Sequence, residues 1–234
     1  MSKSMENNVN SGETKSVVEI CDLLVSSMSK HLNGIECYTD MKNAGYSKSG
    51  WGEWAGAYAE LSIERAIQKH NLSEDVAFYQ DRTKNGMDLD LKFPKLNFFG
   101  DIKTHSTTSS AILGNDMDTI EKYFQENPEG HIYYLVFNFK FSKDSEHNYE
   151  VTHFWNDMLG KSNRNSYGRR MKHDGTLTGA ELLDINTETC KNLDTFKQGR
   201  NSNGRPRKRK VMIKSRNIDA FCIKKWNFPS CDEE

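Results

Sequence analysis

The run HIYYLVFNFKF at residues 131–141 restricts the fold of this 234-residue chain more than any other segment. Its apolar and aromatic residues are nearly uninterrupted, whereas a strand with one side facing solvent alternates between apolar and polar residues. The run therefore predicts a central β-strand that is covered on both faces. A sheet with structure packed against each side is the simplest fold that provides such cover.

The rest of the first 141 residues alternates between helical and strand-like patterns. Apolar residues recur at helical spacing in residues 16–32, where Ser16 and Glu19 match a capping box. The sequence then predicts a loop at 33–50 and a helix at 51–70. It further predicts strands at 76–80, 87–93 and 97–105, and a capped helix at 115–127. The last two of these strands form a hairpin. This order predicts an α/β fold with a mixed central β-sheet of about five strands flanked by helices.

The pattern is weaker beyond residue 149. A strand is predicted at 149–155, basic loops at 161–175 and 197–210, and a return to the body of the fold at 211–228. The sequence contains no internal repeat that would indicate a second domain. We therefore expect a flexible N-terminal tail at residues 1–15 and a single domain at residues 16–234.

The cysteines and the apolar segments indicate the compartment. The five cysteines are scattered and never spaced as Cys-x-x-Cys, which fits neither a disulfide framework nor a zinc site. The N-terminus lacks the apolar segment of a signal peptide, and no stretch approaches the roughly 18 apolar residues of a membrane span. We expect a cytoplasmic protein with reduced cysteines and no membrane association.

Charge is distributed unevenly along the chain. Residues 161–216 hold fifteen Lys or Arg against five Asp or Glu, a net charge of +10, whereas residues 1–160 have a net charge of −9. A basic segment of this kind commonly contacts nucleic acid, although solvated surface charge is the other interpretation. The candidate DNA-binding residues are Arg164, Arg169, Arg170, Arg205, Arg207, Lys208, Arg209 and Lys210.

One acidic residue and one lysine stand out by their context. An acidic residue lies two positions before a lysine four times, at Glu13, Asp40, Asp90 and Asp101. About three such pairs are expected by chance, so the spacing alone indicates nothing. Asp101 and Lys103 differ because they end an aromatic strand and follow, across a short turn, a strand that carries Asp88. Side chains alternate along a strand, so Asp101 and Lys103 point to one side, as do Asp88 and Asp90.

These residue types suit the hydrolysis of phosphodiester bonds. Mg²⁺ prefers oxygen ligands and is often held by one or two carboxylates together with substrate phosphate, which Asp88 and Asp101 can supply. A neighbouring lysine can orient or deprotonate the attacking water and stabilise developing negative charge. Asp90 rivals Asp88 as the first metal ligand. Motifs for nucleotide binding, serine hydrolysis and zinc proteolysis are absent from the sequence.

The quoted residues resemble a known family. Gly86-Met87-Asp88, a hairpin, and Asp101-Ile102-Lys103, preceded by a helix that carries Glu60, are similar to the PD-(D/E)XK nuclease superfamily. The resemblance is greatest to type II restriction endonucleases of the EcoRV-like branch and covers roughly residues 51–141. The sequence departs from the pattern at Met87, where proline often stands.

The resemblance implies a restriction-endonuclease-like fold, a prokaryotic source and roles for individual residues. Asp88 and Asp101 would bind Mg²⁺, Lys103 would lie near the attacking water, and Glu60 would assist. A solvent-facing charge is the alternative for Glu60, because the same helix carries other glutamates. Thr104 and His105 follow the lysine and are candidate contacts to phosphate or base, although a polar strand end is also ordinary.

Three functions follow as hypotheses. The first is a Mg²⁺-dependent type II restriction endonuclease that cuts double-stranded DNA at a short specific sequence as a homodimer, without a nucleotide cofactor, because a palindromic site mirrors twofold protein symmetry. The second is a repair or structure-specific nuclease of the same fold. The third is a non-catalytic nucleic-acid-binding protein that uses the basic segment.

Overall fold

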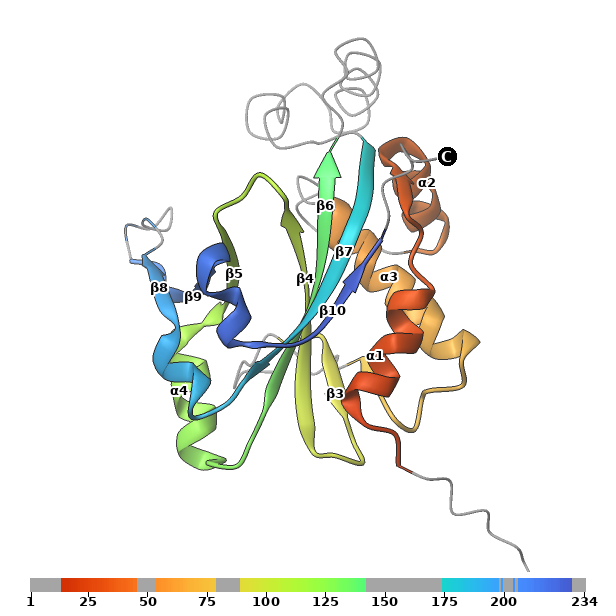
Figure 1. Ribbon diagram of the computed structural model, residues 1–234. Helices are drawn as coiled ribbons and strands as arrows, with labels where there is room; N and C mark the ends of the chain where they lie inside the picture. Colours follow the sequence, from red (N-terminus) through yellow and green to blue (C-terminus); the bar gives the residue numbers. More distant parts are fainter. Residues whose placement is uncertain are drawn as a thin grey trace, which may run out of the picture.

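The computed structural model describes residues 14–45, 54–78, 89–141, 174–197, 199, 204 and 206–228. These residues form a mixed α/β structure in which helices and a small second sheet lie beside a large sheet (Figure 1). Within the described ranges, no helix is long and apolar enough to cross a membrane.

The described residues form α-helices α1 (Val17–Ser26), α2 (Gly34–Asn43), α3 (Trp54–Lys69) and α4 (Met117–Glu126). The large sheet contains β1 (His31–Asn33), β2 (Ala77–Phe78), β3 (Leu91–Phe93), β4 (Phe98–Ser106), β6 (Ile132–Phe141), β7 (Asp174–Ile185) and β10 (Cys222–Asn227). The small sheet contains β5 (Ala111–Asp116), β8 (Asp194–Lys197) and β9 (Arg209–Lys214). Short 3₁₀ helices η3 (Thr189–Asn192) and η4 (Ser215–Ala220) follow β7 and β9.

The large sheet is mixed. Its order is β1-β7-β6-β4-β3-β2, and β10 also pairs with β7, so that β1 and β10 share one edge of β7. β4 and β6 are parallel and are connected through α4, whereas the other neighbouring strands are antiparallel. β3 and β4 form the predicted hairpin, with Phe93 opposite Phe98 and with Asn97 at a φ of 57° in the turn.

Strand β6 lies between β4 and β7, and both of its faces are covered. Tyr133, Leu135 and Phe137 pack with the core formed by α1, α2 and α3. The alternate residues Tyr134 and Val136 pack with α4 and the small sheet. The run at residues 131–141 is therefore the central strand that its composition predicts.

The number of strands differs from the expectation of about five, because the large sheet alone has seven. The longest strand, β7, was not predicted, partly because glycine inside a strand usually weakens it. Here Gly179 is required for packing: a Cβ at this position would lie 2.6 Å from the backbone oxygen of Trp226 in β10. Locally, glycine disfavours a strand, but at position 179 it allows β10 to pack closely against β7.

One local prediction was wrong, and the start of one predicted helix is shifted. Residues 33–50 were expected to be a loop, but α2 begins at Gly34, and the Asn33 Oδ1 atom accepts hydrogen bonds from the backbone N–H groups of Ile35 and Glu36. Asn33 thus acts as a helix cap, which is a sequence signal that the loop prediction overlooked. The helix expected at 115–127 begins at Met117, because the preceding residues extend as β5.

Other predictions hold. The Ser16–Glu19 capping box is present at the start of α1, and the segment at 211–228 returns to the body as the end of β9 together with β10. Cys21 and Cys37 are buried, and the cysteines in the described ranges are free thiols. The strand expected at 149–155 lies outside the described residues.

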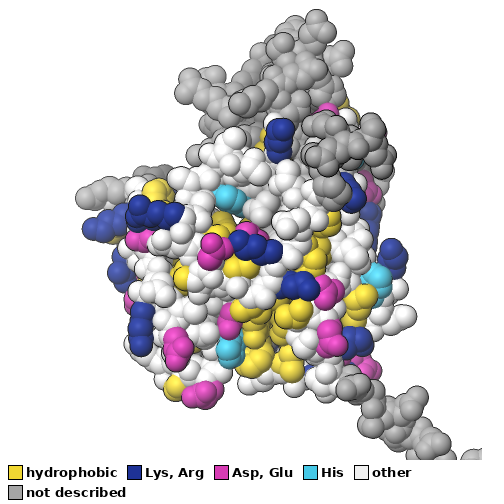
Figure 2. Space-filling model, viewed as in Figure 1, with side chains coloured by type: hydrophobic (Ala, Val, Ile, Leu, Met, Phe, Trp, Pro, Cys, Tyr) yellow, Lys and Arg dark blue, Asp and Glu magenta, His cyan; other side chains and the backbone are white. Residues whose placement is uncertain are grey.

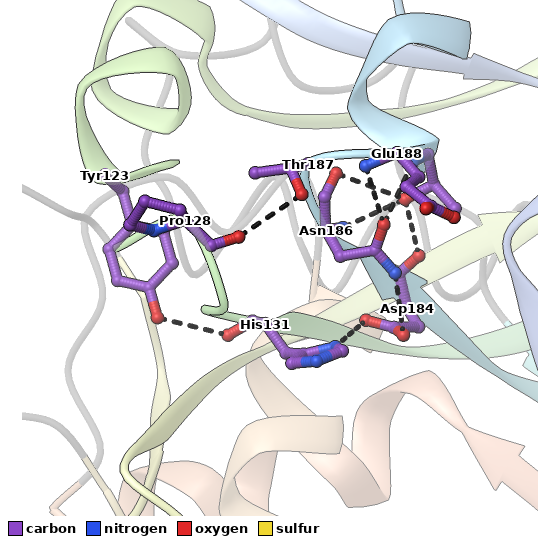
Figure 3. Close-up of polar contacts among 8 residues, drawn as sticks. Tyr123, Pro128, His131, Asp184, Asn186, Thr187 and Glu188 are labelled. Carbon is purple, nitrogen blue, oxygen red and sulfur yellow. Dashed lines mark hydrogen bonds and ion pairs between the residues drawn. The ribbon is translucent and has the colours of Figure 1, made fainter. Parts of the chain in front are cut away.

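A hydrogen-bonded turn closes the end of β7. The Asp184 carboxylate bonds the His131 imidazole (2.8 Å) and the Asn186 amide (3.1 Å), and Asn186 in turn accepts from the backbone N–H groups of Glu188 and Thr189 (Figure 3). His131 immediately precedes β6. The cluster therefore ties the start of the central strand to the end of its neighbour.

Candidate functional site

Asp101 and Lys103 lie on the face of the sheet that α4 and the small sheet cover. Their neighbours on β6 are Tyr134 and Val136, which belong to that core. Asp101 is almost fully buried, with 1% of its surface exposed, and it forms an ion pair with the Lys103 ammonium group. A carboxylate buried to this degree needs a charged partner, since desolvation of an unpaired charge is costly.

Asp90 is the second carboxyl group at this site. The β3–β4 register pairs Leu91 with Gly100, and extending it by one residue places Asp90 opposite Asp101. The Asp90 Oδ2 atom accepts a hydrogen bond from the backbone N–H of Ile102 at 3.1 Å. Two carboxyl groups and one ammonium group thus come together from neighbouring strands.

The charges of these residues act on one another. Burial, together with a hydrogen bond to Asp101 and the Asp101 charge, raises the pKa of Asp90 to about 7. Burial acts to lower the pKa of Lys103, but the negative charges of Asp101, Asp90 and Glu60 outweigh it, and the pKa is raised. The lysine is therefore an ammonium ion at neutral pH.

The donor set fits a hard divalent cation. Asp90 and Asp101 offer carboxylate oxygens side by side, and Mg²⁺ typically takes one or two carboxylates and completes its octahedron with water and phosphate. A cation would also neutralise two negative charges that the burial of the pair makes unfavourable. No group of three or more His, Cys, Asp or Glu residues with metal-binding geometry occurs in the described ranges.

The other predicted site residues are distributed as follows. Glu60 lies on α3 and is close enough for its charge to act on Lys103. Thr104 lies on the opposite face from Lys103, near Gly56 of α3, where its Oγ1 atom would be 3.4 Å from an added Cβ. Asp88 lies outside the described residues, so the structure describes only Asp90 of the two rival aspartates.

His105 continues the face of Asp101 and Lys103 along β4. Its Nδ1 atom is 3.1 Å from the Asn138 Oδ1 atom. Its Nε2 atom is buried and has no hydrogen-bond partner within the described residues. Because a buried polar atom without a partner costs about 1–3 kcal/mol, this atom is a candidate for contact with a bound molecule.

The basic residues of β9 and the segment before it are engaged with acids. Lys208 and Lys210 form ion pairs with Asp116 at 3.3 and 2.9 Å, and Arg209 pairs with Asp118 on α4 at 2.8 Å. Figure 2 shows dark blue and magenta side chains intermixed over this part of the molecule. Arg207 is described and donates its backbone N–H to Gly199. The predicted DNA-binding residues Arg164, Arg169, Arg170 and Arg205 lie outside the described residues.

No family model, curated protein or solved structure matches the chain. The chemistry assigned to the site therefore depends on its own geometry. Two residues in that geometry were not singled out by the sequence as part of a site. Tyr134 and Asn138 both lie within the apolar run at residues 131–141, where an aromatic or amide residue gives no sign of a role beyond that of a strand residue.

Proposed function

We propose that the chain is a Mg²⁺-dependent nuclease of the PD-(D/E)XK type, with a restriction-endonuclease-like core. The observation that carries the proposal is the meeting of Asp90, Asp101 and Lys103 on one face of the β3–β4 hairpin. The order α3, β2, β3, β4, α4, β6 agrees with the element order expected for residues 51–141, with β5 inserted before α4.

In the proposed reaction, Asp90 and Asp101 would hold the cation, with Asp88 as the alternative first ligand. When bound there, Mg²⁺ would supply Lewis-acid chemistry at the scissile phosphate. Lys103 remains an ammonium ion, orients the attacking water and stabilises negative charge on the phosphate oxygens. The Asp101 carboxylate holds this ammonium group in place, and Glu60 adds negative potential around it.

The substrate we propose is double-stranded DNA cut at a short specific sequence, as in type II restriction endonucleases, with the protein acting as a homodimer. His105 and the basic residues near β9 are the proposed DNA contacts among the described residues. The ion pairs of Lys208, Arg209 and Lys210 imply that DNA phosphates would have to compete with Asp116 and Asp118. Thr104, on the α3 side, has less support as a contact to DNA.

The deciding experiment is digestion of plasmid DNA of known sequence with Mg²⁺, with EDTA as the negative control, followed by mapping of the ends. Discrete fragments would support a restriction endonuclease. Cutting of branched or mismatched DNA alone would indicate the repair nuclease, and DNA binding without any cleavage would indicate the non-catalytic protein. Light scattering tests the proposed homodimer.

Site variants should accompany this digestion. Asp101→Ala and Lys103→Ala should abolish cleavage and retain DNA binding, because the ligand and the ammonium act on the reacting phosphate. Lys92→Ala is the matched control, since Lys92 belongs to the second acid-x-Lys pattern of the hairpin and its Nζ atom lies 5.9 Å from the Phe99 ring centroid. Loss of cleavage in the control but not in Lys103→Ala would contradict the proposal.

A further inference from the structure

A buried tyrosine lies against the Lys103 ammonium group. Tyr134 on β6 is the direct neighbour of Asp101 on β4, so its ring lies on the same face as both catalytic candidates. The Lys103 Nζ atom is 5.6 Å from the centroid of this ring. Tyr134 itself is completely buried, whereas 21% of the Lys103 side chain is exposed. The ring thus lies beside the ammonium group, while part of the Lys103 side chain remains exposed.

The position of the ring is fixed through its hydroxyl group. The Tyr134 hydroxyl donates to the Asn115 Oδ1 atom at 2.7 Å and accepts from the Asn115 backbone N–H at 3.3 Å. Asn115 is buried in β5. The neighbouring Gly114 lets β5 approach, because a Cβ there would lie 2.5 Å from the Tyr134 hydroxyl oxygen. The small sheet therefore holds the hydroxyl end of the Tyr134 ring, which is the end farthest from β6.

An ammonium group over an aromatic ring is attracted by the negative face of the ring, and the attraction is stronger where water is partly excluded. A lysine side chain otherwise has four flexible torsions and loses entropy when it is held in one conformation. The Asp101 ion pair restrains the ammonium from one direction, and the ring restrains it from another. Together they reduce the number of positions that Lys103 can occupy.

We propose that Tyr134 is a positioning residue, whose ring holds the Lys103 ammonium group in place for the reaction and is itself held by Asn115 and Gly114. This inference rests on the proposed nuclease function for its catalytic consequence. The alternative is that Tyr134 is only a core aromatic residue. Phe137 provides the comparison, because it is a completely buried aromatic residue of the same strand that packs in the core on the opposite face.

The first test compares turnover in Tyr134→Phe, Tyr134→Leu and Phe137→Leu, at a temperature at which each variant is folded. Tyr134→Leu should lower kcat about ten-fold with little change in KM for DNA, since the lost attraction acts on the catalytic ammonium. Tyr134→Phe keeps the ring but loses the hydroxyl group that Asn115 holds, so its kcat should lie between those of the parent and Tyr134→Leu. Phe137→Leu should turn over like the parent. Equal turnover in the two leucine variants would overturn the proposal.

The second test requires no activity. In protein labelled with ¹³C at lysine Cε, the ring current of Tyr134 should shift the Lys103 Hε signals upfield, and Lys103→Arg identifies these signals by their loss. The shift should persist in Tyr134→Phe and Phe137→Leu and vanish in Tyr134→Leu. Ordinary Lys103 shifts in the parent protein would overturn the proposal even if Tyr134→Leu does not fold.

The two tests separate this inference from the proposed function. A parent protein that cuts DNA but shows no ring-current shift at Lys103 contradicts the inference alone. A parent protein that cuts no nucleic acid under any condition contradicts the nuclease proposal, and the catalytic role of Tyr134 with it.

Discussion

At the scale of single residues, the two acidic candidates for the first metal ligand make different predictions. Asp90 shares a hydrogen bond with Asp101 and accepts from the Ile102 N–H, whereas Asp88 lies outside the described residues. Asp90→Asn should therefore lower the rate of DNA cleavage by roughly 100-fold or more, because a ligand is lost next to the reacting phosphate. Initial rates over a Mg²⁺ titration measure this effect.

Asp88→Asn is the matched variant for that measurement. If Asp90 is the ligand, the Asp88 variant should keep activity much closer to that of the parent. A large loss in Asp88→Asn together with near-normal cleavage in Asp90→Asn would reverse the assignment and make Asp90 a carboxyl group that only supports Asp101. Asp101→Asn should be inactive in either case.

At the scale of elements, the turn after β7 should contribute measurably to stability. The Asp184 carboxylate bonds both His131 and Asn186, and these contacts connect β6, β7 and the turn before η3. Asp184→Ala should lower the free energy of unfolding by about 1–3 kcal/mol, because two polar partners lose a charged acceptor. Chemical denaturation followed by circular dichroism measures the change.

The comparison for this turn is an exposed ion pair. Asp219 pairs with Lys225 at 2.6 Å, but 81% of its side chain is exposed. Asp219→Ala should therefore change the stability by less than about 1 kcal/mol, because solvent screens such pairs. Equal effects of the two substitutions would show that the Asp184 cluster is no more than a surface contact.

At the scale of the whole molecule, the stability of the metal-free protein should depend on pH through Asp90. Its pKa is about 7 in the folded protein and 3.8 in the reference state, so between these values the folded chain binds a proton that the unfolded chain has released. Folding stability from this group therefore falls as pH rises from about 4 to 7. Denaturation midpoints in EDTA across this range test the sign.

Asp90→Asn is again the control, because an amide does not titrate and its curve should lack this decline. Mg²⁺ should stabilise the parent protein near pH 8, where the Asp90 carboxyl group is ionised. At about 100 times its Kd, Mg²⁺ should add about 2.7 kcal/mol to the free energy of unfolding. The account would be contradicted if, in EDTA, the stability of the parent protein changed between pH 4 and 7 in the same way as that of Asp90→Asn.

Much of the fold and part of the candidate site could be predicted because they depend on local periodicity. The uninterrupted apolar run at 131–141 required a strand covered on both faces, and it is the central strand β6. Alternation along β4 placed Asp101 and Lys103 on one side, and they form an ion pair there. Periodicity acts between residues that are close in sequence, so the sequence alone can reveal it.

Tertiary structure decided what depends on segments that are distant in sequence. Gly179 reads as a strand breaker until β10 is seen to lie against it, and Asn115 reads as a helix cap until its contact with Tyr134 is known. The basic residues of β9 read as free charges until Asp116 and Asp118 are found beside them. The sequence by itself determined which side chains share a face of each strand. Only the tertiary structure decided which segments pack against that face, because contacts across the core do not follow from spacing along the chain.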